Sequence, residues 1–92
     1  MMTIGNTPLV RLNVLPEEGS AEVYVKWEGA NPTGSMKDRM ALSMVEGAEA
    51  RGGLRPGGRV VGYAGGSTGS SLAMVCAAKG YRAHFVSSDA FA

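Results

Sequence analysis

Several features that mark specialised chains are scarce or missing in this sequence. Its 92 residues include one cysteine, Cys76, which excludes an internal disulfide or a cysteine zinc cluster and points to a reducing cytoplasm. The longest apolar run, 72–78, is far shorter than the ~20 residues needed to cross a bilayer, so we expect no membrane span. The chain does not open with a basic segment followed by an apolar stretch, so we expect no secretory signal.

Charge is sparse as well. Asp, Glu, Lys and Arg make up 18% of the chain and leave a net charge of +1, whereas globular domains average ~25% charged residues. The basic residues are scattered rather than clustered, which argues against a nucleic-acid or acidic-membrane partner. The single histidine, His84, has no cysteine, acid or second histidine at ligand spacing, so we predict no metal site.

Glycine is abundant, with 14 residues in the chain, and it separates short elements of alternating type. The pattern predicts strands over 9–12 and 22–28, a helix over 36–50, a strand over 59–63, a helix over 68–79 and a strand over 83–87. Within 22–28, Val23, Val25 and Trp27 alternate onto one face, as expected for a half-buried strand. The last three predicted elements form a βαβ unit, which requires parallel strands. The predicted fold class is therefore α/β.

A parallel strand at 83–87 normally has both faces of its sheet covered, and few residues follow it. At this length the chain forms one small domain at most. We expect it to be the N-terminal portion of a larger protein with a partial three-layer fold. In this interpretation 1–34 supply leading strands and turns, and 35–92 supply a helix and the βαβ unit of a small domain.

Lys37 breaks the expected pattern of the first helix. A helical wheel places Lys37 on the apolar side with Met40, Ala41, Met44, Val45 and Ala48, and it places Asp38 on the polar side. Lys37 is also in the first turn, where the helix dipole disfavours an ammonium group. Burial and dipole both favour the neutral amine, the form that attacks a carbonyl carbon. The alternative is an ordinary lysine that reaches water from a helix end. Ser35 is the expected N-cap, and Asp38 would complete a pair resembling a capping box.

The second candidate feature is the loop of Ala64, Gly65, Gly66, Ser67 and Thr68, between a strand and a helix. Its glycines let the backbone approach a ligand, and unpaired N–H groups with two hydroxyls suit a carboxylate or phosphate. The loop lies at the carboxyl end of its strand, where open α/β sheets bind ligands. It matches neither the G-x-G-x-x-G nor the P-loop pattern. The alternative is a tight turn in which Ser67 or Thr68 is an ordinary N-cap.

Three stretches together resemble a known family: Ile4-Gly-Asn-Thr-Pro-Leu-Val-Arg-Leu12, Lys26-Trp-Glu-Gly-Ala-Asn-Pro-Thr-Gly-Ser-Met-Lys-Asp-Arg39 and Gly65-Gly-Ser-Thr-Gly69. They are similar to the opening of the cysteine synthase and cystathionine β-synthase family, which are pyridoxal-phosphate enzymes of fold type II. The resemblance implies that Lys37 holds pyridoxal 5'-phosphate as a Schiff base and moves the substrate α-proton. It also implies that 64–68 bind the substrate carboxylate and that Ser67 stands beside the cofactor ring.

For the complete protein, the resemblance implies β-replacement or β-elimination on an O-activated serine-type amino acid, and a cytoplasmic homodimer. Ala64, Gly65 and Ser67 stand where the family usually has Thr, Ser and Asn, which fits a subgroup with its own substrate. The family's phosphate-binding loop comes later than these residues, so we expect the 92-residue chain alone to be inactive. Two other hypotheses remain: a non-catalytic fragment, and a small anion- or nucleotide-binding α/β module.

Overall fold

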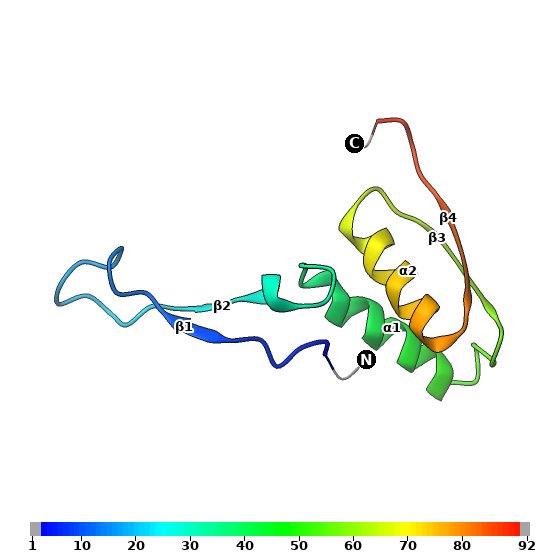
Figure 1. Ribbon diagram of the computed structural model, residues 1–92, viewed down its shortest axis with the longest axis horizontal. Coiled ribbons are helices and arrows are strands. Elements are labelled where there is room, and N and C mark those ends of the chain that lie inside the picture. The colour runs from blue at the N-terminus through cyan, green and yellow to red at the C-terminus, as the bar shows by residue number, and fades with distance from the viewer. Residues whose placement is uncertain (1–2, 91–92) are drawn as a thin grey trace.

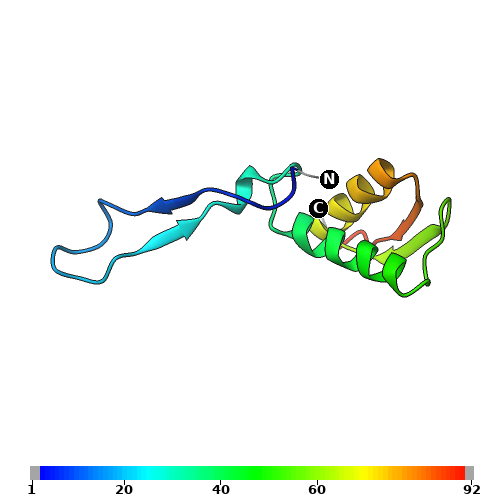
Figure 2. The same ribbon diagram turned by 90° about the horizontal axis from the view of Figure 1, so that it is seen from below.

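A β-hairpin and an α/β body make up the computed structural model, which describes residues 3–90. The elements in chain order are β1 (Leu9–Arg11), β2 (Tyr24–Lys26), the 3-10 helix η1 (Glu28–Ala30), α1 (Lys37–Ala50), β3 (Arg59–Tyr63), α2 (Ser67–Lys79) and β4 (Arg82–Val86). The antiparallel hairpin β1–β2 projects away from the two helices and the parallel pair β3–β4 (Figure 1, Figure 2). The molecule is therefore elongated, measuring 54 × 33 × 18 Å.

The predicted βαβ unit is confirmed. β3 and β4 are parallel neighbours, with Val61 opposite His84 and Gly62 opposite Phe85. Gly80 ends α2 in the left-handed conformation, with φ 81°, which glycine adopts without steric cost. Both α2 and β4 begin one residue earlier than predicted.

The core lies where α2 packs against both α1 and the sheet. Its buried members are Ala41, Val45, Leu72 and Val75. Cys76 is also fully buried. Alternation along the strands places Val61 and Tyr63 on the opposite face of the sheet, where they are 65% and 67% exposed. One face of the sheet thus packs on the core, and within residues 3–90 the other face is exposed to solvent.

Neither helix reaches membrane-spanning length. α1 has 14 residues and α2 has 13. In the described part of the chain, no helix is both long and apolar enough to cross a bilayer.

The prediction of a half-buried strand over 22–28 is wrong in two respects. The strand covers only Tyr24–Lys26, and Trp27 lies just beyond it. Val23, Val25 and Trp27, expected on a buried face, are all exposed. The reason is tertiary: β1 and β2 pair with each other, and no other described helix or strand packs on them.

The buried side of α1 agrees only in part with the helical-wheel prediction. Ala41 and Val45 are buried as predicted, whereas Met40 and Met44 are exposed and Asp38 joins the buried stripe. The stripe is displaced because α2 packs on the Asp38 side of α1. There Ser71 of α2 donates a hydrogen bond to the Asp38 carboxylate. Asp38, assigned to the polar side, therefore has no solvent exposure at all.

Candidate active site

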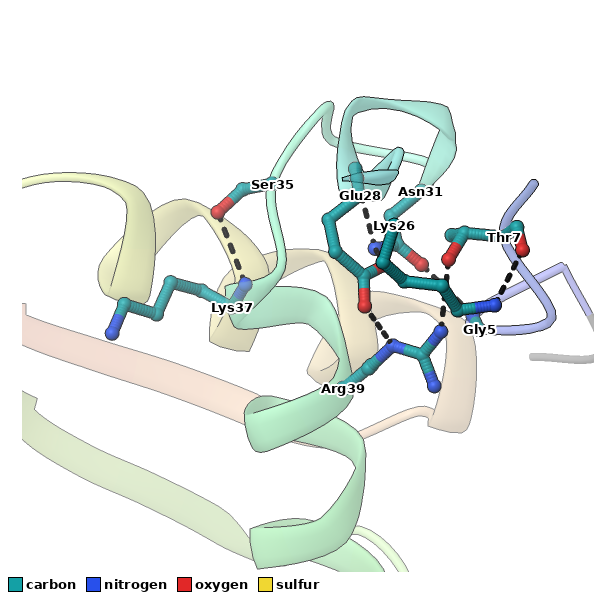
Figure 3. A network of polar contacts seen from close by, with 8 residues as sticks. All are labelled: Gly5, Thr7, Lys26, Glu28, Asn31, Ser35, Lys37 and Arg39. Atoms are coloured by element: carbon teal, nitrogen blue, oxygen red, sulfur yellow. Dashed lines mark hydrogen bonds and ion pairs between the residues drawn. The ribbon is translucent and has the colours of Figure 1, made fainter. Parts of the chain in front are cut away.

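Lys37 is the first residue of α1, and its side chain is half-buried at the edge of the packed stripe. The side chain extends from the start of α1 on the side opposite the contacts of Arg39 (Figure 3). Among residues 3–90, its Nζ has no carboxylate within 4.0 Å and no hydrogen-bond acceptor. The other two lysines are engaged, since Lys26 Nζ donates to the Thr7 carbonyl and Lys79 Nζ pairs with Glu49 at 3.0 Å.

The turn that leads into Lys37 is capped by a serine. Met36, the residue before α1, is already in the right-handed helical region and makes no side-chain cap bond. Ser35 makes the N-cap side-chain bond that the sequence predicts, because its Oγ accepts the Lys37 backbone N–H at 3.0 Å. Asp38 does not complete a capping box with Ser35. Its carboxylate turns inward to Thr33 instead.

Asp38 is the functional candidate that the sequence analysis missed. Its Oδ2 accepts the Thr33 backbone N–H at 2.8 Å, and its Oδ1 accepts the hydroxyls of Thr33 at 2.5 Å and Ser71 at 2.6 Å. Burial alone raises the pKa of a carboxyl, but the hydrogen bonds from Ser71 and Thr33 outweigh burial and hold the pKa of Asp38 below its ordinary value. The signal in the sequence that could have indicated Asp38 is Ser71, because a hydroxyl next to apolar Leu72 on a packed helix needs a polar partner.

The glycine-rich loop ends in an uncapped helix. α2 begins at Ser67, its cap residue is Gly66, and no side chain caps the first turn, so the N-cap interpretation of Ser67 or Thr68 is wrong. Within the described residues, the backbone N–H groups of Ser67 and Thr68 have no acceptor. Two unpaired N–H groups at the positive end of a helix are a chemical match for an anion.

The glycines of this loop have distinct roles. A Cβ at Gly69 would lie 3.2 Å from the Ala64 Cβ, so glycine there lets the helix fold closely against the loop. A Cβ at Gly66 would meet nothing within 4 Å, so the space in front of the helix is open. Thr68 also lines a groove of about 430 Å³, which continues between α1 and β3 past Met44 and Tyr63.

The beginnings of α1 and α2 are held together. Ser71, which bonds Asp38, lies one helical turn after Ser67 on the same side of α2. Asp38 itself directly follows Lys37. One hydrogen bond therefore links the helix start that carries the unpaired lysine to the helix start that carries the unpaired N–H groups.

A second polar network anchors the segment before Lys37 (Figure 3). Arg39 Nε pairs with Glu28 Oε1 at 2.6 Å, and Arg39 Nη2 donates to Thr7 Oγ1 at 3.1 Å. Asn31 accepts the Gly5 N–H through Oδ1 at 2.8 Å and donates to Glu28. These contacts fix both ends of the hairpin against α1.

Metal-ligating side chains do not gather in this part of the chain. Among residues 3–90, no group of three or more His, Cys, Asp or Glu side chains is placed to hold an ion. Asp38 and Glu28 are engaged by hydroxyl, amide and guanidinium donors.

Comparison with known proteins identifies the class. Residues 1–91 match the family model described as "Pyridoxal-phosphate dependent enzyme", so the chain belongs to this family. It is 51% identical over 87 residues to cysteine synthase B of Salmonella typhimurium, covering 95% of this chain and 29% of that protein. The chain thus spans about three tenths of the length of that relative.

Solved structures agree with the sequence relatives. O-ureido-L-serine synthase superimposes with a TM-score of 0.92 at 50% identity, over 99% of this chain and 28% of that one. A hydrogen sulfide-producing enzyme from Fusobacterium nucleatum gives a TM-score of 0.89 at 44% identity, over 99% of this chain and 30% of that one. The fold is therefore a portion of the fold type II architecture, as the sequence resemblance implied.

The residues present fit the cofactor that this family uses. An aldehyde requires an accessible amine, and Lys37 Nζ is not paired with any described carboxylate. The anionic groups of a substrate or cofactor require donors, which the first turn of α2 provides. Which residues hold the cofactor and substrate stays a prediction from the sequence.

Proposed function

We propose that the full-length protein is a pyridoxal-phosphate-dependent enzyme that performs β-replacement or β-elimination on an O-activated serine-type amino acid. The observation that carries this proposal is the pairing of two helix starts. The first bears the half-buried Lys37, with no described ion-pair partner, and the second bears the uncapped N–H groups of Ser67 and Thr68. The similarity to cysteine synthase B and O-ureido-L-serine synthase supports this choice of reaction.

Each site residue has a separate task in this proposal. Lys37 Nζ holds the cofactor covalently and later takes the proton from the substrate α-carbon. The loop from Ala64 to Thr68 binds the substrate carboxylate through backbone N–H groups and hydroxyls. Ser67 also stands beside the cofactor ring. The bound cofactor supplies the electron sink that makes the α-proton acidic, and the protein supplies orientation.

The substrate, assembly and location follow the same proposal. The Ala64-Gly-Gly-Ser67 sequence is smaller than the family's usual loop, which favours a substrate different from that of typical cysteine synthases. A homodimer of the full-length protein is proposed from the resemblance alone. A cytoplasmic location agrees with Cys76, which is free and buried rather than held in a disulfide.

The test is turnover by the full-length protein. With added pyridoxal phosphate, sulfide and a panel of O-activated L-serines, we expect cysteine to form from at least one of them, and we expect Lys37→Ala to abolish the reaction. Ser67→Ala should impair turnover, whereas Ser70→Ala, an exposed serine of the same helix, should not. Cofactor binding without reaction of any O-activated serine would contradict the proposed chemistry. Nucleotide binding that survives Lys37→Ala and ignores pyridoxal phosphate would favour the anion-binding module.

A further inference from the structure

Asp38 is a buried carboxylate that the proposed chemistry does not use. In the described part of the chain it is the only acidic residue with no solvent exposure. Three hydrogen bonds, from the Thr33 N–H, the Thr33 hydroxyl and the Ser71 hydroxyl, satisfy it. Burying a charge costs free energy unless the charge is well hydrogen-bonded. The three donors therefore stabilise the buried carboxylate in this position.

The donors come from both sides of the candidate site. Thr33 lies in the turn that leads into Lys37, and Ser71 lies one helical turn beyond Ser67 in α2. The two hydroxyls are themselves 3.4 Å apart, so three side chains meet at one point between the helices. A single carboxylate therefore fixes the lysine-bearing turn relative to the loop that precedes α2.

We propose that Asp38 is a positioning residue that sets the placement of Lys37 Nζ relative to the uncapped first turn of α2. The inference rests on the proposed function and deepens it. If Lys37 holds the cofactor and the α2 turn holds the substrate carboxylate, the distance and orientation between Lys37 Nζ and that turn must be fixed. A misplacement of about 1 Å between reacting groups can cost about a hundredfold in rate.

The contact chemistry indicates which substitutions are informative. Asp38→Asn keeps the size but replaces one acceptor with an NH2 donor. That NH2 either faces the Thr33 backbone N–H or requires the Thr33 and Ser71 hydroxyls to accept instead of donate. Ser71→Ala removes one donor and leaves the carboxylate and Lys37 untouched. Ser70→Ala and Asp89→Asn make the same chemical changes at exposed positions and are the matched controls.

The experiment follows the full-length protein after mixing with excess pyridoxal phosphate. The rate constant for the appearance of the visible lysine-linked band is measured, together with kcat per cofactor-loaded subunit and the substrate KM. A residue that only stabilises the fold lowers the amplitude of the band, because fewer molecules are folded. In a variant that stays predominantly folded, such a residue leaves the rate constant unchanged, and it leaves kcat unchanged because kcat is expressed per cofactor-loaded subunit.

We expect Asp38→Asn to lower both rate constants about tenfold or more and Ser71→Ala to lower them about threefold, with KM changed less than threefold. Both controls should stay within about twofold of the wild type. Wild-type rate constants in Ser71→Ala and in folded Asp38→Asn would overturn the inference, and Ser71→Ala alone decides it if Asp38→Asn does not fold. A wild-type protein that forms no band at Lys37 would instead overturn the proposed function.

Discussion

Arg39 Nε contacts Glu28 Oε1 at 2.6 Å, and this ion pair joins the first turn of α1 to the end of the β-hairpin. Burial alone raises the pKa of a carboxyl, but hydrogen bonds from Arg39, Thr7 and Asn31 outweigh it and lower the pKa of Glu28. No other described helix or strand packs on the hairpin strands, so this network, together with Ile4 packed against the core, attaches the hairpin to the body.

Loss of the ion pair should loosen the hairpin without unfolding the body. We expect Glu28→Gln to speed amide hydrogen exchange across 5–31 by about threefold or more, while exchange in α2 stays unchanged. The control is Glu22→Gln, which breaks the exposed pair of Arg11 and Glu22 at 3.4 Å and should change little. Equal exchange rates in the two variants would show that the network does not anchor the hairpin.

The space in front of Gly66 gives a test that separates binding from folding. Since an added Cβ meets nothing within 4 Å, Gly66→Ala should fold normally. If the α2 turn binds the substrate carboxylate, the new methyl group occupies that space and should raise the substrate KM about tenfold, which corresponds to about 1.4 kcal/mol.

The matched control for Gly66→Ala is Gly53→Ala, where a Cβ makes an ordinary contact of 3.8 Å far along the chain from the loop. It should leave both KM and the unfolding temperature unchanged. A Gly66→Ala protein with the wild-type KM would remove the loop from the substrate site. An equal rise in KM in both variants would point to a general effect of the substitution.

Acid should destabilise the protein through carboxylates whose pKa is lowered in the folded state. Hydrogen bonds from Tyr81 and Lys79 lower the pKa of Glu49, and those from Ser71 and Thr33 outweigh burial to lower that of Asp38. A depressed folded-state pKa adds stability that is complete above the ordinary values, 4.5 for Glu and 3.8 for Asp, and is lost as pH falls through the folded-state value.

The measurement is the thermal unfolding midpoint between pH 7 and pH 2.5. We expect a plateau down to about pH 5 and a steady fall below it. Asp38→Asn should lower the unfolding midpoint on the plateau. It should also make the fall of the midpoint below about pH 5 shallower, because the contribution of the Asp38 carboxyl to the pH dependence is removed. An Asp38→Asn protein in which this fall is unchanged would contradict the assigned ionisation of this carboxyl.

Local signals were sufficient to predict the βαβ unit from the sequence. Alternating residues mark β3, and Gly80 ends α2 because only a residue tolerant of positive φ suits that position. Burial of the hairpin was predicted wrongly because alternation shows that a strand has two faces, and only tertiary contacts decide whether either is covered. Val25 and Trp27 therefore look like core residues but are exposed.

The candidate site was predictable in part. The position of Lys37 in the first turn of α1 and the glycine-rich loop before α2 follow from the sequence, while their assigned roles stay predictions. Asp38 was placed on the wrong side because its charge was taken as a sign of exposure. Its burial depends on Ser71, which is 33 residues away in the chain, and no local pattern contains that contact.

Covalent trapping at Lys37 tests the central claim most directly. The full-length protein is mixed with pyridoxal phosphate, reduced with borohydride and mapped by peptide mass spectrometry. Lys26 and Lys79 serve as internal controls, because both ammonium groups are already engaged by Thr7 and Glu49. The account predicts stoichiometric label on Lys37 and little on the controls. Label spread over exposed lysines, or its absence from Lys37, would contradict it.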